Sequence, residues 1–127
     1  MYEWVRNEAR NPYATIYSTN ITLNRSAIEF LDHPWHVMLG VDRKAKQIAI
    51  KPVTEQEVEQ GLIAKEELYR ISIGRSYGRI ANRSFCNLVA ETFRLDLSVE
   101  VGRKYPLFYD EAAKILIIDL GKGELLL

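Results

Sequence analysis

The chain has little cysteine, no surplus of charge and no long apolar run. Its single cysteine, Cys86, excludes an internal disulfide and is typical of a reducing compartment, so we expect a cytoplasmic protein. No stretch approaches the roughly 18 apolar residues of a membrane-spanning helix, and the polar first residues are unlike a signal peptide, so we expect no membrane partner. The 17 basic residues balance the 17 acidic ones, so an argument for a polyanionic partner must rest on a local patch.

The residue patterns of catalytic and metal sites are also scarce. His33 and His36 are three residues apart, but Pro34 disfavours the helix on which such a pair would share a metal ion, so a turn is the better interpretation. Cys86 lies among apolar residues as an inert thiol would, and both histidines belong to the other half of the chain. Phosphate-loop, nucleophile-elbow and dinucleotide-binding motifs are missing. We therefore expect no enzyme, no metal site and no cofactor.

Two short echoes indicate that the chain is internally duplicated. Asn-Arg-Ser occurs at 24–26 and again at 82–84, and DRKAKQIAI (42–50) matches DEAAKILII (110–118) in the same order. Coincidence is the alternative, because three-residue matches are common. The 127 residues are the length of one domain. We predict a single domain, 1–127, with the following parts: a first half-repeat over 13–53, a connecting helix over 54–61 and a second half-repeat over 67–120.

Each half is predicted to read strand, strand, helix, strand, strand. In the first half, Ser26 and Glu29 have the spacing of a capping box and predict the start of a short helix. In the second half, Asn82 or Ser84 is the expected helix N-cap, and a period-two apolar pattern predicts a strand over 95–101. The remaining strands are expected at 14–19, 21–24, 36–41, 47–53, 67–74, 79–82, 106–110 and 113–120.

The segments between the strands carry their own signals. Thr54 and Glu57 form another capping-box pattern, and Gly61 is a suitable helix stop, so an acidic, solvated connecting helix is predicted. Asp42 and Asp110 occupy equivalent turns, where turn formation is a better explanation than acid–base chemistry.

The stretch RISIGRSYGRIANR, residues 70–83, carries four arginines and no acid. The arginines are Arg70, Arg75, Arg79 and Arg83, and Tyr77 lies among them. Such a hairpin could contact phosphates, giving a salt-dependent affinity that is largely independent of sequence, with Tyr77 as an accessory stacking surface. The alternatives are another anion, or a solvated face whose arginines pair with the acidic segment 55–67 of the same molecule.

Gly78-Arg79-Ile80 resembles the Gly-Arg-[Val/Ile] start of the second strand in the AbrB/MazE/SpoVT-type swapped-hairpin DNA-binding family. The resemblance covers 70–124 well and 13–53 loosely. In that family the unit is half of a homodimeric barrel, so the resemblance implies a β-rich α+β fold in which two strand-strand-helix-strand-strand halves form an internal pseudo-dimer barrel. It implies DNA contacts at Arg75 and Arg79, and at Arg70 and Arg83 by proximity. Residues 11–24 contain no base, so only one half would be basic.

The sequence predicts a non-enzymatic DNA-binding, transcription-regulator-like module whose partner is double-stranded DNA. The alternative is a protein-interaction or structural module that keeps the barrel scaffold. The apolar C-terminal tail, residues 123–127, would then dock on the domain or mediate self-association.

Overall fold

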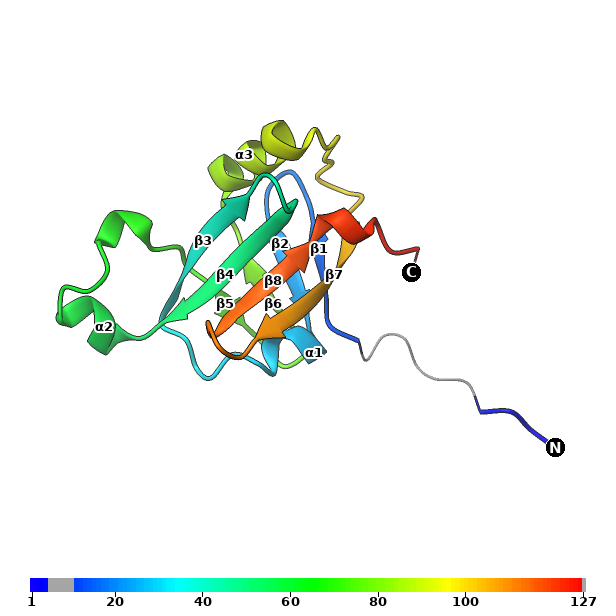
Figure 1. Cartoon of the computed structure of the whole chain (residues 1–127), viewed down its shortest axis with the longest axis horizontal. Coiled ribbons are helices and arrows are strands. Elements are labelled where there is room, and N and C mark those ends of the chain that lie inside the picture. The colour runs from blue at the N-terminus through cyan, green and yellow to red at the C-terminus, as the bar shows by residue number, and fades with distance from the viewer. Residues whose placement is uncertain (5–10, 127) are drawn as a thin grey trace.

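Eight antiparallel strands form one curled sheet in residues 1–4 and 11–126, the part of the chain that the computed structural model describes (Figure 1). The strands are β1 (Tyr13–Ile16), β2 (Ile21–Asn24), β3 (His36–Asp42), β4 (Gln47–Val53), β5 (Ser72–Ile73), β6 (Tyr77–Ile80), β7 (Arg103–Asp110) and β8 (Ile115–Asp119). Their order across the sheet is β3-β4-β8-β7-β1-β2-β6-β5. The predicted β-rich α+β class is confirmed.

Three α-helices accompany the sheet in the described residues: α1 (Arg25–Ile28), α2 (Glu55–Glu59) and α3 (Arg83–Phe93). Short 3-10 turns occur at Lys65–Glu67 and Leu120–Lys122. In Figure 1, α3 lies across one end of the curled sheet and α1 lies near the opposite end, whereas α2 sits on a loop that projects from the body. The helix α3 therefore closes one end of the core, while the acidic connection stands apart from it.

The two outermost strands of the sheet approach each other through one backbone bridge. The Val37 amide in β3 donates to the carbonyl oxygen of Tyr69 at 2.9 Å, and the Tyr69 amide donates back at 2.8 Å. Tyr69 lies just before β5, so this pair joins the sheet's first strand to the segment that leads into its last. The two edges of the curled sheet therefore meet at this pair of hydrogen bonds.

Alternating apolar residues fill the space inside the curl. The side chains of Ile16, Ile21, Leu23, Ile48, Ile50, Ile80, Leu116 and Ile118 are all less than 2% exposed. Because successive strand residues point to opposite faces, these β-branched and leucine side chains share the inner face, and the residues between them, such as Thr22, Ala49 and Ile117, face outward. Burying each such side chain contributes roughly 1.5–3 kcal/mol, so this cluster holds the sheet in its curl.

The repeated Asn-Arg-Ser motif adopts the same local geometry in both halves of the chain. Asn24 Oδ1 accepts a hydrogen bond from the Ala27 amide at 3.1 Å, and Asn82 Oδ1 accepts one from the Phe85 amide at 2.8 Å. Each asparagine is thus an N-cap that satisfies an otherwise unpaired amide three residues later. The predicted Ser26–Glu29 capping box is wrong, because the helix begins at Arg25 and its cap is Asn24.

Removing the Asn24 side chain should cost more stability than removing that of Asn82. Loss of either cap costs about 1 kcal/mol of unfolding free energy. Asn24 also accepts from the Tyr13 amide at 3.0 Å and donates to the Asn11 carbonyl at 2.8 Å, so Asn24→Ala breaks the tie to the start of β1 as well. Urea denaturation measures both losses, with the exposed helical Asn87→Ala as the matched control. Equal losses for the two cap variants would contradict the bridging role of Asn24.

The second pair of matching segments, 42–50 and 110–118, also shares a turn geometry. Asp42 Oδ1 accepts from the Ala45 amide at 2.9 Å, and Asp110 Oδ1 accepts from the Ala112 and Ala113 amides at 3.0 and 3.1 Å. Both hairpin turns then end on a lysine in the left-handed region, Lys46 with φ 56° and Lys114 with φ 57°. The interpretation of the two aspartates as turn formers is confirmed.

The connecting segment also follows its sequence signals. Thr54 and Glu57 form a complete capping box at the start of α2, and Gly61 has a positive φ of 72° just after the helix ends. Glycine takes this conformation without steric cost, so it terminates the helix.

The predicted strand over 95–101 is wrong, and the predicted strand over 67–74 is too long. Residues 95–101 form no strand, because the Ser98 hydroxyl accepts from the Glu100 and Val101 amides at 3.1 and 3.3 Å and bends the backbone into a turn. The predicted strand 67–74 is reduced to Ser72–Ile73 plus the bridge at Tyr69.

Candidate nucleic-acid interface

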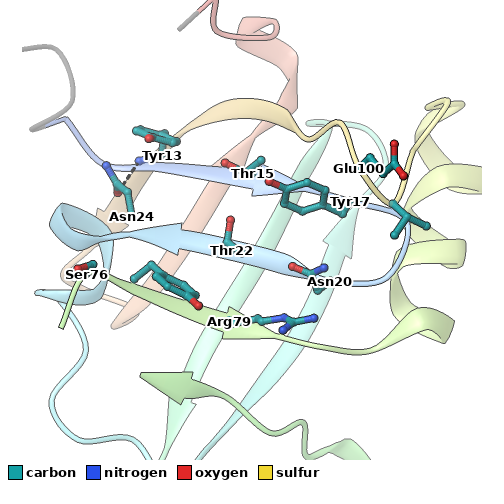
Figure 2. A pocket seen from close by; sticks show the side chains of 11 residues that line it. Tyr13, Thr15, Tyr17, Asn20, Thr22, Asn24, Ser76, Arg79 and Glu100 are labelled. Carbon is teal, nitrogen blue, oxygen red and sulfur yellow. Dashed lines mark hydrogen bonds between the residues drawn. The ribbon is translucent and has the colours of Figure 1, made fainter. Parts of the chain in front are cut away.

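The outer face of β1, β2 and β6 carries a polar and aromatic surface. Ala14 and Ile16 of β1 are fully buried on the inner side, whereas Tyr13 and the residue that follows the strand, Tyr17, are half-buried on the outer side. Side chains from these three strands and from the loop before β7 surround a hollow of about 560 Å³ (Figure 2). Its lining consists of Tyr13, Thr15, Tyr17, Asn20, Thr22, Asn24, Ser76, Tyr77, Arg79, Val99 and Glu100. We name this surface the tyrosine hollow.

A row of directly paired residues crosses the tyrosine hollow. Thr15 pairs with Lys104 on one side and with Thr22 on the other, and Thr22 pairs with Arg79. Directly opposite residues in antiparallel strands project from the same face. The row therefore places a basic residue at each end and two threonines between them, and three interstrand spacings separate the backbone positions of the two basic residues by about 14 Å.

The β5–β6 hairpin positions the arginine stretch. The Gly74 amide donates to the Tyr77 carbonyl at 2.9 Å, which closes the turn that carries Arg75. Tyr77, 54% exposed, and Arg79, also exposed, line the tyrosine hollow, and Arg75 lies in the turn beside Ser76 of the same lining. The hairpin thus brings two of the five predicted contact residues, Tyr77 and Arg79, into the lining, and Arg75 lies next to it without lining it.

The other two predicted contacts lie apart from the tyrosine hollow. Arg70 is exposed before β5, and Arg83 is the exposed first residue of α3. Neither side chain lines the hollow. Their predicted inclusion rested on closeness in sequence.

The arginine stretch is not neutralised by the acidic connection. Across residues 1–4 and 11–126, the ion pairs are Arg25–Glu29 and Arg103–Glu124, and neither involves an arginine of the 70–83 stretch. The alternative in which these arginines pair with segment 55–67 is therefore wrong for the described part of the chain. Helix α2, which belongs to this acidic segment, lies on a loop that projects away from the body of the domain (Figure 1).

The Gly78-Arg79-Ile80 motif has a packing explanation. Gly78 is buried opposite Leu23, and a Cβ atom there would lie 2.8 Å from Cγ2 of Ile28 in α1. Glycine lets α1 pack against the inner side of β6, and the next residue, Arg79, then points outward by strand alternation. Ile80 returns to the core at 2% exposure. The motif thus seats the helix and directs the arginine into the hollow.

A second glycine shapes the position of Tyr17. A Cβ atom on Gly102 would lie 2.1 Å from Cγ2 of Thr15 and 2.7 Å from Cζ of Tyr17. The Tyr17 ring therefore rests against bare backbone at the start of β7. Thr15, 6% exposed, is pressed into the same corner, so the ring has a fixed seat.

Adding a methyl group at this seat should destabilise the domain. Gly102→Ala forces Thr15 and the Tyr17 ring to move, and overpacking of this kind costs roughly 1–3 kcal/mol of unfolding free energy. Urea denaturation measures the loss. Gly40→Ala is the matched control, because a Cβ atom on that strand glycine meets nothing within 4 Å. Equal stability of the two variants would show that Tyr17 does not rest on Gly102.

Arg79 is the one base among the described lining residues, and Lys104 lies beside the hollow, at the Tyr13 ring, without lining it. Lys104 Nζ lies 5.6 Å from the centre of the Tyr13 ring, a cation–π distance, and Arg79 enters from the opposite side. Glu100 is the one acid among the described residues of the lining, and Figure 2 shows it beside Tyr17. An anion would therefore be favoured along the row from Lys104 to Arg79 and disfavoured near Glu100.

The contribution of the first half was missed by sequence reasoning. Tyr13, Thr15 and Tyr17 form a period-two polar and aromatic pattern, and Thr22 repeats it on β2. That pattern was available as a signal of an outward face. Its meaning depended on the pairing of β2 with β6, which brings Arg79 to these residues and cannot be read from the sequence.

The other titratable candidates are placed away from this face. Cys86 is 1% exposed, and burial raises the pKa of its thiol to about 11, which disfavours the nucleophilic thiolate. In the described residues no three histidine, cysteine, aspartate or glutamate side chains gather as metal ligands would. The same residues include no helix with the length and apolar character needed to cross a membrane.

The C-terminal tail docks in part on its own domain. Glu124 pairs with Arg103, and the Leu125 amide donates to the Lys104 carbonyl at 2.7 Å. The hydrogen bond that Arg103 Nε donates to the Glu124 carboxylate also raises the pKa of the Arg103 guanidinium. Leu126 is 97% exposed, and Leu127 lies outside the described residues.

Comparisons with known proteins give no relative for this chain. No protein-family model, no curated protein and no solved structure matches it.

Proposed function

We propose that the chain is a non-enzymatic DNA-binding, transcription-regulator-like module of the swapped-hairpin type, which contacts double-stranded DNA through the β5–β6 hairpin. The observation that carries the proposal is the exposure of Arg75 and Arg79, which form no ion pair with the described carboxylates. Arg79 also stands in line with two threonines and Lys104 on one face. Hydroxyl, guanidinium and ammonium groups are the side-chain donors that proteins use for phosphate oxygens.

The charge distribution sets the kind of binding to expect. The chain has no net charge, so long-range attraction to DNA is weak and affinity depends on local contacts. Each phosphate neutralised by an arginine or lysine releases counterions, which makes affinity fall steeply with salt. Such contacts fix the protein on the backbone without reading bases.

We propose further that the curled sheet is an internal pseudo-dimer. Matched N-caps at Asn24 and Asn82 and matched left-handed lysines at Lys46 and Lys114 support a duplication. Exchanging β1–β4 with β5–β8 leaves the order of strands around the curl unchanged when the Val37–Tyr69 bridge is counted as a closing contact. An experimental structure in which the two halves fail to superpose would contradict this proposal.

A salt-dependent binding titration tests the function. Fluorescence anisotropy of a labelled random-sequence duplex, measured at about 50 and 200 mM salt, should show binding that weakens steeply across that range. Arg43→Ala, an exposed arginine in the turn after β3, is the control for general loss of charge. Absence of binding at the lower salt concentration would overturn the proposal.

A second candidate function is protein association through the outer face of the opposite part of the sheet. Gly40, Ala49, Ile117 and Phe108 pair in one row across β3, β4, β8 and β7, and Phe108 is 38% exposed. This apolar row contrasts with the polar row of the tyrosine hollow. If it mediates self-association, sedimentation should detect a dimer that Phe108→Glu dissociates; a monomer at all concentrations tested would exclude self-association.

A further inference from the structure

The tyrosine hollow differs from a surface that only contacts phosphates. The first half contributes no arginine or lysine from residues 11–24, and it supplies Tyr13 and Tyr17 to the same face. Tyr13 begins β1 and Tyr17 follows its last residue, so the two positions are four residues apart, which corresponds to about 13 Å of extended chain. Tyr77 approaches from β6, where it pairs with Asn24 of β2. Three aromatic rings thus surround a polar floor.

Packing against Gly102 determines the position of the Tyr17 ring. Its ring rests on the bare backbone of Gly102, where a Cβ atom would come within 2.7 Å of Cζ. The neighbouring floor residues, Thr15 and Asn20, are only 6% and 8% exposed. Figure 2 shows Tyr17 between Thr15 and Glu100, at the opposite end of β1 from Tyr13. A planar ring held this way offers a flat face to a ligand.

Polar groups at the floor suit the edge of a nucleobase. Thr22 occupies the centre of the hollow in Figure 2, with Asn20 and Arg79 toward the Tyr17 end. Hydroxyl and amide groups both donate and accept hydrogen bonds, so they accommodate different bases. The volume of about 560 Å³ lies within the range of pockets for small organic ligands.

Cations stand where the phosphates of a bound strand would pass. Lys104 and Arg79 terminate the row that contains Thr15 and Thr22, so they flank the hollow on both sides. Proteins that bind single strands combine cations along the backbone with aromatic rings under the bases. This hollow contains both components.

We propose that the tyrosine hollow binds an unpaired base of single-stranded DNA, stacked on Tyr17, with the flanking phosphates at Arg79 and Lys104. This inference rests on the proposed DNA-binding function, because Arg79 belongs to both. In a duplex the base faces are stacked on one another and only the edges are accessible in the grooves. A ring that stacks on a base face therefore selects unpaired strands. The hairpin accordingly contacts duplex phosphates as proposed above, and the tyrosine hollow adds affinity for single-stranded or locally opened DNA, which the module therefore binds more tightly than intact duplex.

Binding of a labelled oligothymidylate of about 12 nucleotides tests the inference, since such a length spans the usual site of one small single-strand-binding domain. At about 50 mM salt, wild-type protein should bind it at least about tenfold more tightly than a duplex of equal length, and Tyr17→Ala should lose about tenfold or more, as loss of one stacking contact predicts. Tyr17→Phe should restore binding because the ring is kept. Phe108→Ala, an exposed aromatic residue on the other part of the sheet, should have no effect.

The outcomes separate this inference from the function on which it rests. Duplex bound as tightly as the single strand, with Tyr17→Ala unchanged, would overturn the inference and leave DNA binding intact. Failure of Tyr17→Phe to restore binding would also overturn it, because the hydroxyl rather than stacking would then matter. No binding of either DNA would overturn both. Thermal unfolding of Tyr17→Ala confirms that the variant is folded, and Thr22→Val provides a second variant on the floor of the hollow that is expected to weaken single-strand binding.

Discussion

Arg75→Ala/Arg79→Ala is expected to lose at least about tenfold in affinity for DNA at about 50 mM salt. Hydrogen bonds to charged groups contribute roughly 1.5–3 kcal/mol, and 1.4 kcal/mol corresponds to a factor of ten in affinity. Both arginines are exposed on one hairpin, and neither pairs with a described carboxylate, so no ion pair among the described residues must be broken before they bind phosphate. Anisotropy titrations at several salt concentrations measure the affinity and its salt dependence.

The salt dependence distinguishes phosphate contacts from other effects of the substitutions. Each lost phosphate contact reduces the slope of log affinity against log salt by about 0.9 for duplex DNA, so the double variant should lose a slope of about 2. The loss should be similar for unrelated DNA sequences. Arg43→Ala should leave the slope unchanged. An unchanged affinity in the double variant would show that the hairpin is not the contact surface.

Ile118→Ala is expected to destabilise the domain by about 2–5 kcal/mol. Ile118 is fully buried and pairs with Ile48 where β8 meets β4, the strands that join the two long hairpins of the sheet. Truncation removes apolar contact and leaves a cavity at this junction, which the surrounding β-branched residues fill poorly. Urea denaturation monitored by tryptophan fluorescence measures the change in unfolding free energy.

The control is a truncation outside the core. Val101→Ala removes methyl groups from a side chain that is 70% exposed, so its effect should stay within about 0.5 kcal/mol. A similar loss for Ile118→Ala and Val101→Ala would contradict the assignment of the β4–β8 junction to the core.

Sequence patterns predicted the local elements better than their assembly. The hairpin over 36–53 was predicted nearly to the residue, because its apolar alternation and its aspartate turn agree with one another. The apolar alternation over 95–101 led to the wrong prediction of a strand, because the Ser98 hydroxyl accepts hydrogen bonds from two amides that a strand would have paired. Local hydrogen bonds of this kind compete with strands and leave the apolar pattern unchanged.

The site was only half predictable for a related reason. Arg79 and Tyr77 were recognisable from a run of arginines and a turn, which are local features. Thr15 and Tyr17 join them only because β1 pairs with β2 and β2 pairs with β6. Such pairings link residues far apart in the chain, and no local propensity encodes them. The order of strands in the sheet was hidden for the same reason.

Backbone amide chemical shifts during a DNA titration test most directly whether the outer face of β1, β2 and β6 is the binding surface. With ¹⁵N-labelled protein and the short single-stranded oligonucleotide at low salt, the account predicts shifts concentrated at Thr15, Tyr17, Thr22 and Arg79, which line the tyrosine hollow. The amide of Ile117 in the apolar row should stay unchanged. Shifts concentrated around Ile117, with none in the tyrosine hollow, would contradict the account.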